Sequence, residues 1–266
     1  MKTKLLLLLS VSFLIISCSS DDSGSDDNGN PATSLPINSG NYWTYDVLNH
    51  ATPDAPETWT RDSLYVANDT VINTITYKKM KTLMASTGFF SGTLRNNGLL
   101  IDGNKMKITG SVDFSVGLPT SLAFSVSEFI ILKEGANAGE SLSSTSGSFD
   151  QTISGYPLTF TYTLRSEANG SQSSFTSDGV TYNDITKTKV ILNLKITTTV
   201  SGFSLTVMNA QDVLVSNQYY SKNIGMVYNH TYINYSLNSI PNGPTLPFPS
   251  SGNQTQEEFL DAYSIN

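Results

Sequence analysis

The stretch LKITTTVSGFSLTV, from Leu194 to Val207, decides the fold class. Apolar and polar side chains alternate on both sides of Ser201-Gly202, and a two-residue turn with glycine second suits a type I′ β-hairpin. The expected cross-strand pairs are Val200 with Phe203, Thr198 with Leu205, and Ile196 with Val207, all on the face that carries Leu194. A slip of one residue would move this whole set to the other face, so the turn and the pattern predict the same register.

The same alternation continues outside this hairpin. Leu158, Phe160, Tyr162 and Leu164 are separated by threonines, which is typical of a strand with one buried face. Between Leu35 and Leu237 no helical period stands out, and turn residues interrupt the alternation at intervals of roughly eight to twelve residues. The sequence therefore predicts an all-β, antiparallel domain.

Strand length indicates how the sheet is shaped. The run from Lys187 to Val200 would extend about 45 Å at about 3.3 Å per residue, which is long for a strand. The apolar phase also changes between Tyr182 and Ile185, which predicts a bulge near Asp184. Long, bulged strands favour a strongly curved sheet or an open barrel, and we expect about 10 to 12 strands.

A second segment also predicts its own register. Asn97-Gly98 and Gly103-Asn104 are read as successive tight turns, with a looser four-residue loop as the alternative for each. One expected row across three strands is Leu94, Ile101 and Met106, with Leu99 aligned to Ile108 in the next row and Asp102 opposite Lys105. The Asp102-Gly103-Asn104 tripeptide is read as a hairpin turn, because a calcium loop needs further acidic ligands.

The chain divides into four expected regions: 1–17, 18–36, 37–237 and 238–266. Residues 37–237 form the β domain, and 238–266 a proline-rich arm with a C-terminal element. Thr255 and Glu258 have capping-box spacing, so we expect a short C-terminal helix. The alternative is a final edge strand through Tyr263 to Ile265.

The N-terminus carries a targeting signal. Lys2 and Lys4 precede the apolar run Leu5 to Ile16, which is too short to span a bilayer as a helix. The run ends in Ser17-Cys18, and this arrangement resembles the lipobox of bacterial lipoproteins. The resemblance implies cleavage by signal peptidase II between Ser17 and Cys18. It also implies attachment of acyl chains such as palmitate to Cys18, which anchors the protein to the membrane.

The segment behind Cys18 is polar and acidic, which predicts a flexible tether over residues 18–36. Its Cys-Ser-Ser-Asp-Asp start resembles the export signal of Bacteroidota surface lipoproteins, which implies an outer-membrane protein exposed on the cell surface. A periplasm-facing lipoprotein is the alternative. The segments 40–45, 77–79 and 219–227 also resemble landmarks of uncharacterised Bacteroidota lipoproteins, and that likeness implies no activity.

Composition excludes several function classes. The 266 residues include 22 acidic and 15 basic ones, a formal net charge of −7, which argues against a nucleic-acid partner. One cysteine and two histidines cannot form a disulfide framework or a four-ligand zinc site, and we expect no metal or other cofactor. No motif for nucleophilic, phosphate or zinc chemistry occurs, so the expectation is a protein that is not an enzyme.

A hydrolase that uses two carboxylates stays open as an alternative. Its weakness is that the glutamates outside the C-terminal segment are mostly flanked by turn residues, which indicates solvated charge: Glu57, Glu128, Glu134, Glu140 and Glu167.

An aromatic stripe is the best candidate site. Alternation places Tyr228, His230 and Tyr232 on one face and Val227, Thr231, Ile233 and Tyr235 on the other. Phenol and imidazole rings could bind a sugar or an aromatic ligand, although the stripe is also compatible with an ordinary half-exposed β face. Trp43 and Tyr45, which alternate in the first strand, are assigned to the core.

Two tripeptides, Asp62-Ser63-Leu64 and Asp69-Thr70-Val71, resemble acceptors for O-glycosylation in Bacteroidota, at Ser63 and Thr70. The main functional hypothesis is a lipid-anchored, non-catalytic protein that binds a glycan or protein ligand at the outer membrane. The alternatives are a carrier of a lipid or other hydrophobic ligand in a half-barrel cavity, and a polysaccharide hydrolase. The assembly state is left open.

Overall fold

The computed structural model describes residues 34–50, 56–114, 121–200, 202–239 and 249–266. The predicted signal peptide, the Ser17–Cys18 cleavage site, the acylated Cys18 and most of the tether lie outside the described residues. So do Ser201 of the predicted turn and most of the proline-rich arm. Across the described part of the chain, no helix has the length and apolar character needed to cross a membrane.

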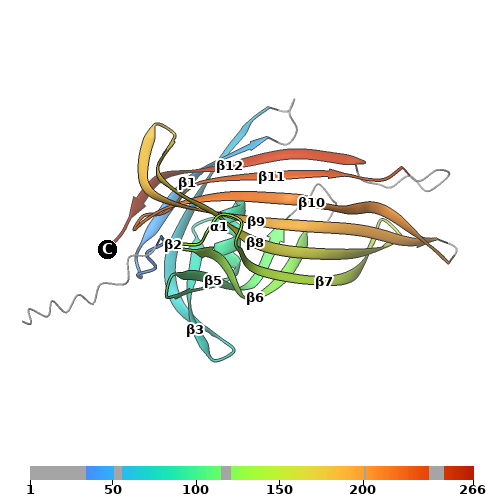
Figure 1. The fold of residues 1–266 in the computed structure, drawn as a ribbon, viewed down its shortest axis with the longest axis horizontal. Coiled ribbons are helices and arrows are strands. Elements are labelled where there is room, and N and C mark those ends of the chain that lie inside the picture. The colour runs from blue at the N-terminus through green and yellow to red at the C-terminus, as the bar shows by residue number, and fades with distance from the viewer. Residues whose placement is uncertain (1–33, 51–55, 115–120, 201, 240–248) are drawn as a thin grey trace, which may run out of the picture.

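Twelve antiparallel strands of the described chain form a single sheet (Figure 1). Their spatial order is β6-β5-β4-β3-β2-β1-β12-β11-β10-β9-β8-β7, so the sheet curls into a nearly closed barrel with β6 and β7 at its two edges. The prediction of a curved antiparallel sheet or open barrel is confirmed. In chain order the elements are β1 (Tyr42–His50), β2 (Thr58–Ile72), β3 (Ile75–Thr82), α1 (Phe89–Asn96), β4 (Gly98–Asp102), β5 (Lys105–Phe114), β6 (Leu122–Lys133), β7 (Ser141–Ile153), β8 (Tyr156–Ser177), β9 (Val180–Val200), β10 (Phe203–Ser221), β11 (Gly225–Ser236) and β12 (Ser251–Ser264).

The seam between β6 and β7 is bridged by side chains. The Ile130 N–H of β6 donates to Ser143 Oγ at 2.9 Å, and Ser166 Oγ of β8 donates to the Ile130 carbonyl at 2.5 Å. The Phe124 ring lies 4.5 Å from that of Tyr162, centroid to centroid. Hydroxyl and aromatic contacts thus close the barrel where no strand ladder does.

The barrel interior is a packed core. Trp43 and Tyr45 are fully buried, as predicted, and Phe160 and Leu164 of β8 are buried with them. The helix α1 lies on the concave side of the sheet, because the Phe90 ring meets that of Tyr45 at 5.8 Å and that of Tyr220 at 6.0 Å. Most of the interior is therefore filled by side chains.

The β9–β10 hairpin has the predicted register near its turn and a shifted one farther on. Val200 pairs with Phe203 and Thr198 with Leu205, as expected. The pairing of Ile196 with Val207 is wrong: Ile196 faces Met208, because the register shifts between Thr206 and Met208. A bulge at this point lets Val207 and Met208 both be buried, which strict alternation would not allow.

The β4–β5 hairpin confirms three predicted pairs, namely Leu99 with Ile108, Ile101 with Met106, and Asp102 with Lys105. The placement of Leu94 in a third strand is wrong, because Leu94 lies in α1. The predicted tight turn at Asn97-Gly98 is wrong for the same reason: Asn97 is the C-cap of the helix.

We call the distal part of the β8–β9 hairpin, residues 170–186, the arm. It is separate from the proline-rich arm predicted within residues 238–266. Gly170 and Asp184 have left-handed φ values of +75° and +51°, and the β8–β9 register shifts between Ala168 and Ser171. Tyr182 and Ile185 are both buried, so the predicted phase change around Asp184 is present. These irregularities bend the arm, drawn yellow to orange, away from the line of the long strands (Figure 1).

The C-terminal element is a strand. The predicted short helix is wrong. The alternative of a strand through Tyr263 is right about the strand, which runs to Ser264, but wrong about the edge, because β12 lies between β1 and β11 and pairs with both. Its backbone pairs with β1 from Thr255 to Ser264 and with β11 from Ser251 to Phe259, whereas an isolated short helix would leave its end groups unpaired. Glu258, the expected capping residue, points into the barrel and is fully buried.

Candidate ligand-binding surfaces

The predicted aromatic stripe exists on the outer face of β11. The His230 ring centroid lies 6.3 Å from that of Tyr228 and 3.9 Å from that of Tyr232. On the opposite face, Val227 and Thr231 are buried in the barrel. The geometry of the stripe is as predicted, and its role in binding stays a prediction.

Two further rings extend the stripe across the sheet. Phe259 of β12 pairs with Tyr228, with ring centroids 5.4 Å apart, and Trp59 of β2 lies 6.1 Å from Phe259. We call Trp59, Phe259, Tyr228, His230 and Tyr232 together the aromatic surface. Trp59 and Phe259 join the stripe only because β12 returns between β1 and β11, so sequence alternation alone did not place them there.

The arm covers one end of the aromatic surface. Phe175 of the arm stacks on Tyr219 at 4.4 Å and meets Tyr228 at 5.4 Å, and the Tyr182 hydroxyl donates to the Leu260 carbonyl at 3.4 Å. Tyr228 is consequently half-buried. Trp59 and Tyr232 remain open, with 58% and 43% of their surface exposed.

Polar groups accompany the rings. The Tyr228 hydroxyl donates to Glu257, and burial, followed by this hydrogen bond, raises the pKa of that phenol. Burial lowers the pKa of His230 below 6.5, with Glu257 opposing the shift and His50 adding to it. This shift favours the neutral imidazole, which presents one donor and one acceptor nitrogen.

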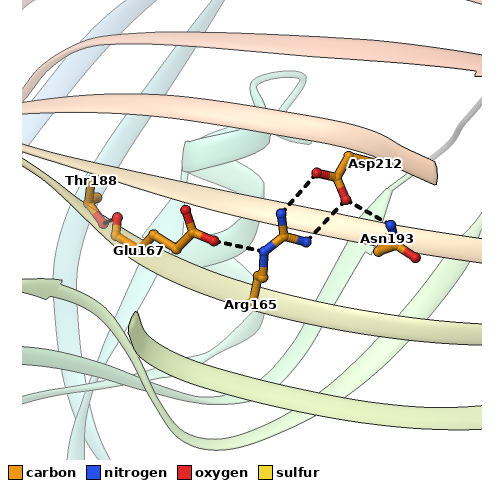
Figure 2. Close-up of polar contacts among 5 residues, drawn as sticks. All are labelled: Arg165, Glu167, Thr188, Asn193 and Asp212. Carbon is orange, nitrogen blue, oxygen red and sulfur yellow. Dashed lines mark hydrogen bonds and ion pairs between the residues drawn. The ribbon is translucent and has the colours of Figure 1, made fainter. Parts of the chain in front are cut away.

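A charged network flanks the aromatic surface on β8, β9 and β10 (Figure 2). Arg165 donates through Nε to Glu167 at 2.8 Å and through both terminal nitrogens to Asp212, at 3.1 and 2.9 Å. Asn193 also donates to Asp212, at 2.9 Å, and the Thr188 hydroxyl donates to the Glu167 carbonyl at 3.0 Å.

The charges of this network satisfy one another. Asp212 chiefly, then Glu167, raise the pKa of the Arg165 guanidinium against the opposing effect of partial burial. Arg165 pairs across the ladders with Ile191, Ile191 with Val215, and Val215 with Tyr232. The network thus holds the strands beside the aromatic surface in register.

Inside the barrel, two carboxylates hold the start of α1. Asp62 of β2 accepts from the backbone N–H of Thr87 at 3.0 Å and of Gly88 at 2.8 Å. Glu258 of β12 accepts from the N–H of Phe90 at 2.8 Å and of Ser91 at 3.3 Å. Gly88, the N-cap, makes no side-chain cap, so α1 depends on distant residues for the capping that helices usually find locally.

The buried Glu258 continues into a polar network. Asn229 Nδ2 donates to Glu258 at 2.8 Å, and Ser216 Oγ donates to Asn229 Oδ1 at 2.7 Å. Burial raises the pKa of Glu258, while the hydrogen bonds from Phe90, Asn229 and Ser91 oppose that shift. Asp62 and Glu258 form a pair of buried carboxylates, but backbone N–H groups occupy them. Their arrangement supports a structural role.

A pocket of about 450 Å³ lies between α1 and the inner face of β10 to β12. Phe89, Leu214 and Ile233 supply its apolar part, and Arg95 and Asp113 supply its charges. The other lining residues carry amide, hydroxyl or imidazole groups or are glycines: Asn49, His50, Ser86, Thr87, Gly88, Gly92, Asn96, Thr231, Gln254, Thr255 and Gln256. The carboxylates of Asp62 and Glu258 do not line it.

The remaining predicted residues are dispersed. Ser63 and Thr70 are half-buried in β2, and their glycosylation stays a prediction. Asp102-Gly103-Asn104 forms the expected hairpin turn, with Asp102 in an ion pair with Lys107 at 2.7 Å.

Among the five predicted surface glutamates, Glu57 and Glu128 are exposed. The other three are half-buried and bonded: Glu134 to Ser34, Glu140 to Lys133 and Glu167 to Arg165. Within the described ranges, no three His, Cys, Asp or Glu side chains gather as a metal site.

Comparison with known proteins identifies no family. No family model matches the chain, and no curated protein matches it. The chain aligns with the crystal structure of a LolA superfamily protein from Nitrosomonas europaea over 87% of this chain and 88% of that one, at 11% identity and a TM-score of 0.21. A likeness at this level does not bear on function.

Proposed function

We propose that this is a lipid-anchored, non-catalytic binding protein of the cell envelope, and that its aromatic surface binds a glycan. The observation that carries the proposal is the row of rings across β2, β12 and β11 with Trp59 and Tyr232 open to solvent. Ring faces offer apolar area to a sugar, and the neutral His230 with Glu257 offers hydrogen bonds at the ring edges.

The size of the aromatic surface favours an extended ligand. Trp59 and His230 lie on β2 and β11, which are three strand spacings apart through β1 and β12. At about 4.8 Å per spacing, this separation is about 14 Å. A chain of several sugar units fits this span better than a single sugar.

In this proposal the acylated Cys18 anchors the protein to the membrane. The resemblance of the tether to the export signal of surface lipoproteins favours the outer face of the outer membrane. Radiolabelled palmitate should enter the wild-type protein and not Cys18→Ala. Protease added to intact cells should degrade the protein if it faces outward. Protection from protease in intact cells, with cleavage after the outer membrane is opened, would support the periplasm-facing alternative.

The binding test is a glycan array followed by affinity electrophoresis with each glycan that binds. Trp59→Ala and Tyr232→Ala should each weaken retardation at least about fivefold, because each removes an exposed ring that gives about 1 kcal/mol or more. Phe203→Ala is the matched control, since Phe203 is also an exposed aromatic residue, at 74%, but lies at the β9–β10 turn. No glycan bound, or equal losses for all three variants, would overturn the proposal.

A second candidate function is carriage of a small hydrophobic ligand, and the pocket beside α1 is the observation that favours it. Its volume of about 450 Å³ falls in the range of small-molecule sites, and Phe89, Leu214 and Ile233 give it an apolar wall. The test is binding of the fluorescent probe N-phenyl-1-naphthylamine. Gly92→Leu, which places a side chain in the pocket, should abolish the fluorescence increase, and an unchanged signal would count against a carrier.

A further inference from the structure

We infer that the pocket beside α1 takes an amphiphilic carboxylate, with Arg95 pairing to the carboxylate and Phe89, Leu214 and Ile233 holding the hydrocarbon part. This inference rests on the carrier function and names its ligand class. A binding pocket of this kind needs an apolar wall and a small number of polar groups that fix the ligand's orientation.

The guanidinium of Arg95, unpaired in the part of the chain that the structure describes, points to an anionic ligand. Arg61 and Arg165 each contact two carboxylates, whereas the Arg95 guanidinium has no ion-pair partner within the described residues. The backbone carbonyl of Arg95 accepts from Lys79 Nζ at 2.7 Å, so a second cation lies at the same helix end. A carboxylate is the group that a guanidinium binds with two parallel hydrogen bonds.

The other charge at the pocket is already engaged. Asp113 accepts a hydrogen bond from Asn96 Nδ2 at 2.9 Å and makes no ion pair with Arg95. Asp113 would repel an anion at this site, so removing its charge should strengthen binding. That opposite effect of two neighbouring charges separates a specific contact from a general loss of structure.

The pocket can be closed without breaking the fold. Gly92 lies inside α1, and a Cβ built on it meets only Ser86 Oγ, at 3.5 Å, which is ordinary contact. A leucine at this position suits the helix better than glycine and projects into the pocket. Gly92→Leu therefore tests occupancy of the pocket, and circular dichroism checks that the variant is folded.

The experiment measures octanoate, 1-octanol and acetate binding by calorimetry, using the mature chain from residue 18 with Cys18→Ala so that no acyl chain competes. Octanoate should bind about tenfold more tightly than octanol, and acetate should bind weakest, because it lacks the hydrocarbon part. Arg95→Gln should remove the advantage of octanoate over octanol, and Asp113→Asn should strengthen octanoate binding severalfold. Lys195→Gln, at an exposed lysine on β9, is the charge-matched control and should change nothing.

The outcomes separate the ligand class from the carrier function. If octanol binds as well as octanoate and Arg95→Gln has no effect, while Gly92→Leu abolishes both, the carboxylate assignment is wrong and the carrier function stands. If none of the three probes binds, or if Gly92→Leu leaves binding unchanged, both fail. Circular dichroism of each variant confirms that the fold is kept.

Discussion

Glu258 Oε1 accepts a hydrogen bond from the backbone N–H of Phe90 at 2.8 Å, so the last strand, β12, caps a helix whose bonded residue lies 168 positions earlier in the chain. The N–H of Ser91 and the amide of Asn229 donate to the same carboxylate. One buried side chain thus links α1, β11 and β12. The capping residue that the sequence pattern identified does cap a helix, but the helix belongs to another part of the chain.

Glu258→Ala should lower the free energy of unfolding by about 3 kcal/mol, because it leaves several buried donors unpaired. Glu258→Gln should cost less, since it keeps one acceptor oxygen. Urea unfolding measures both. Glu57→Gln, at an exposed glutamate, is the control and should stay within about 0.5 kcal/mol of the wild type. A cost for Glu258→Ala as small as the control's would refute the capping role.

Two glycines near the start of α1 should respond in opposite directions to alanine. A Cβ at Gly88 would run into the Glu258 carboxylate, so Gly88→Ala should destabilise the fold by about 2 kcal/mol. A Cβ at Gly92 meets only ordinary contact, so Gly92→Ala should stabilise it by about 0.5–1 kcal/mol through helix propensity. Thermal unfolding distinguishes them, and equal shifts would contradict the close approach at Gly88.

Asp212→Asn should weaken the network around Arg165 by about 1 kcal/mol at pH 7, a modest value because both partners are partly exposed. Hydrogen bonding from Arg165 lowers the pKa of Asp212 below 3.8 in the folded state. The folded state therefore binds the proton less readily than the unfolded one, so this stability is present above pH 3.8 and is lost as the pH falls through the folded pKa. Unfolding measured at descending pH should show the variant and wild type converging, and a gap that widens on acidification would be the contrary result.

Phe175→Ala should loosen the arm without unfolding the barrel. The substitution removes the stacking on Tyr219 and the contact with Tyr228, which are the aromatic contacts that hold residues 170–186 against the sheet. Hydrogen exchange should accelerate in the arm and stay slow in β10 and β11. Val180→Ala, at an exposed position near the arm's turn, is the control, and faster exchange in that variant to the same degree would argue against the role of Phe175.

Features set by residues close together in the chain could be predicted from the sequence, and features set by distant contacts could not. Leu99 with Ile108 and Thr198 with Leu205 could be paired from sequence, because a tight turn sets their register locally. The pairing of Ile196 with Met208 could not be predicted, because the bulge that buries both Val207 and Met208 has no local signal in the sequence. The stripe on β11 could be predicted for the same reason as the hairpins: alternation along one strand assigns its two faces.

By itself, the sequence determined the antiparallel β class, the inward and outward faces of the strands, and the candidate stripe at Tyr228, His230 and Tyr232. Each of these depends on residues a few positions apart. Only the tertiary structure decided that α1 forms, that Phe259 and Trp59 extend the stripe, and that the arm covers Tyr228. The physical reason is that these features gain their stability from contacts between segments far apart in the chain. The capping of α1 by Glu258 and the contact of Phe259 with Tyr228 exist only once β12 is seated between β1 and β11.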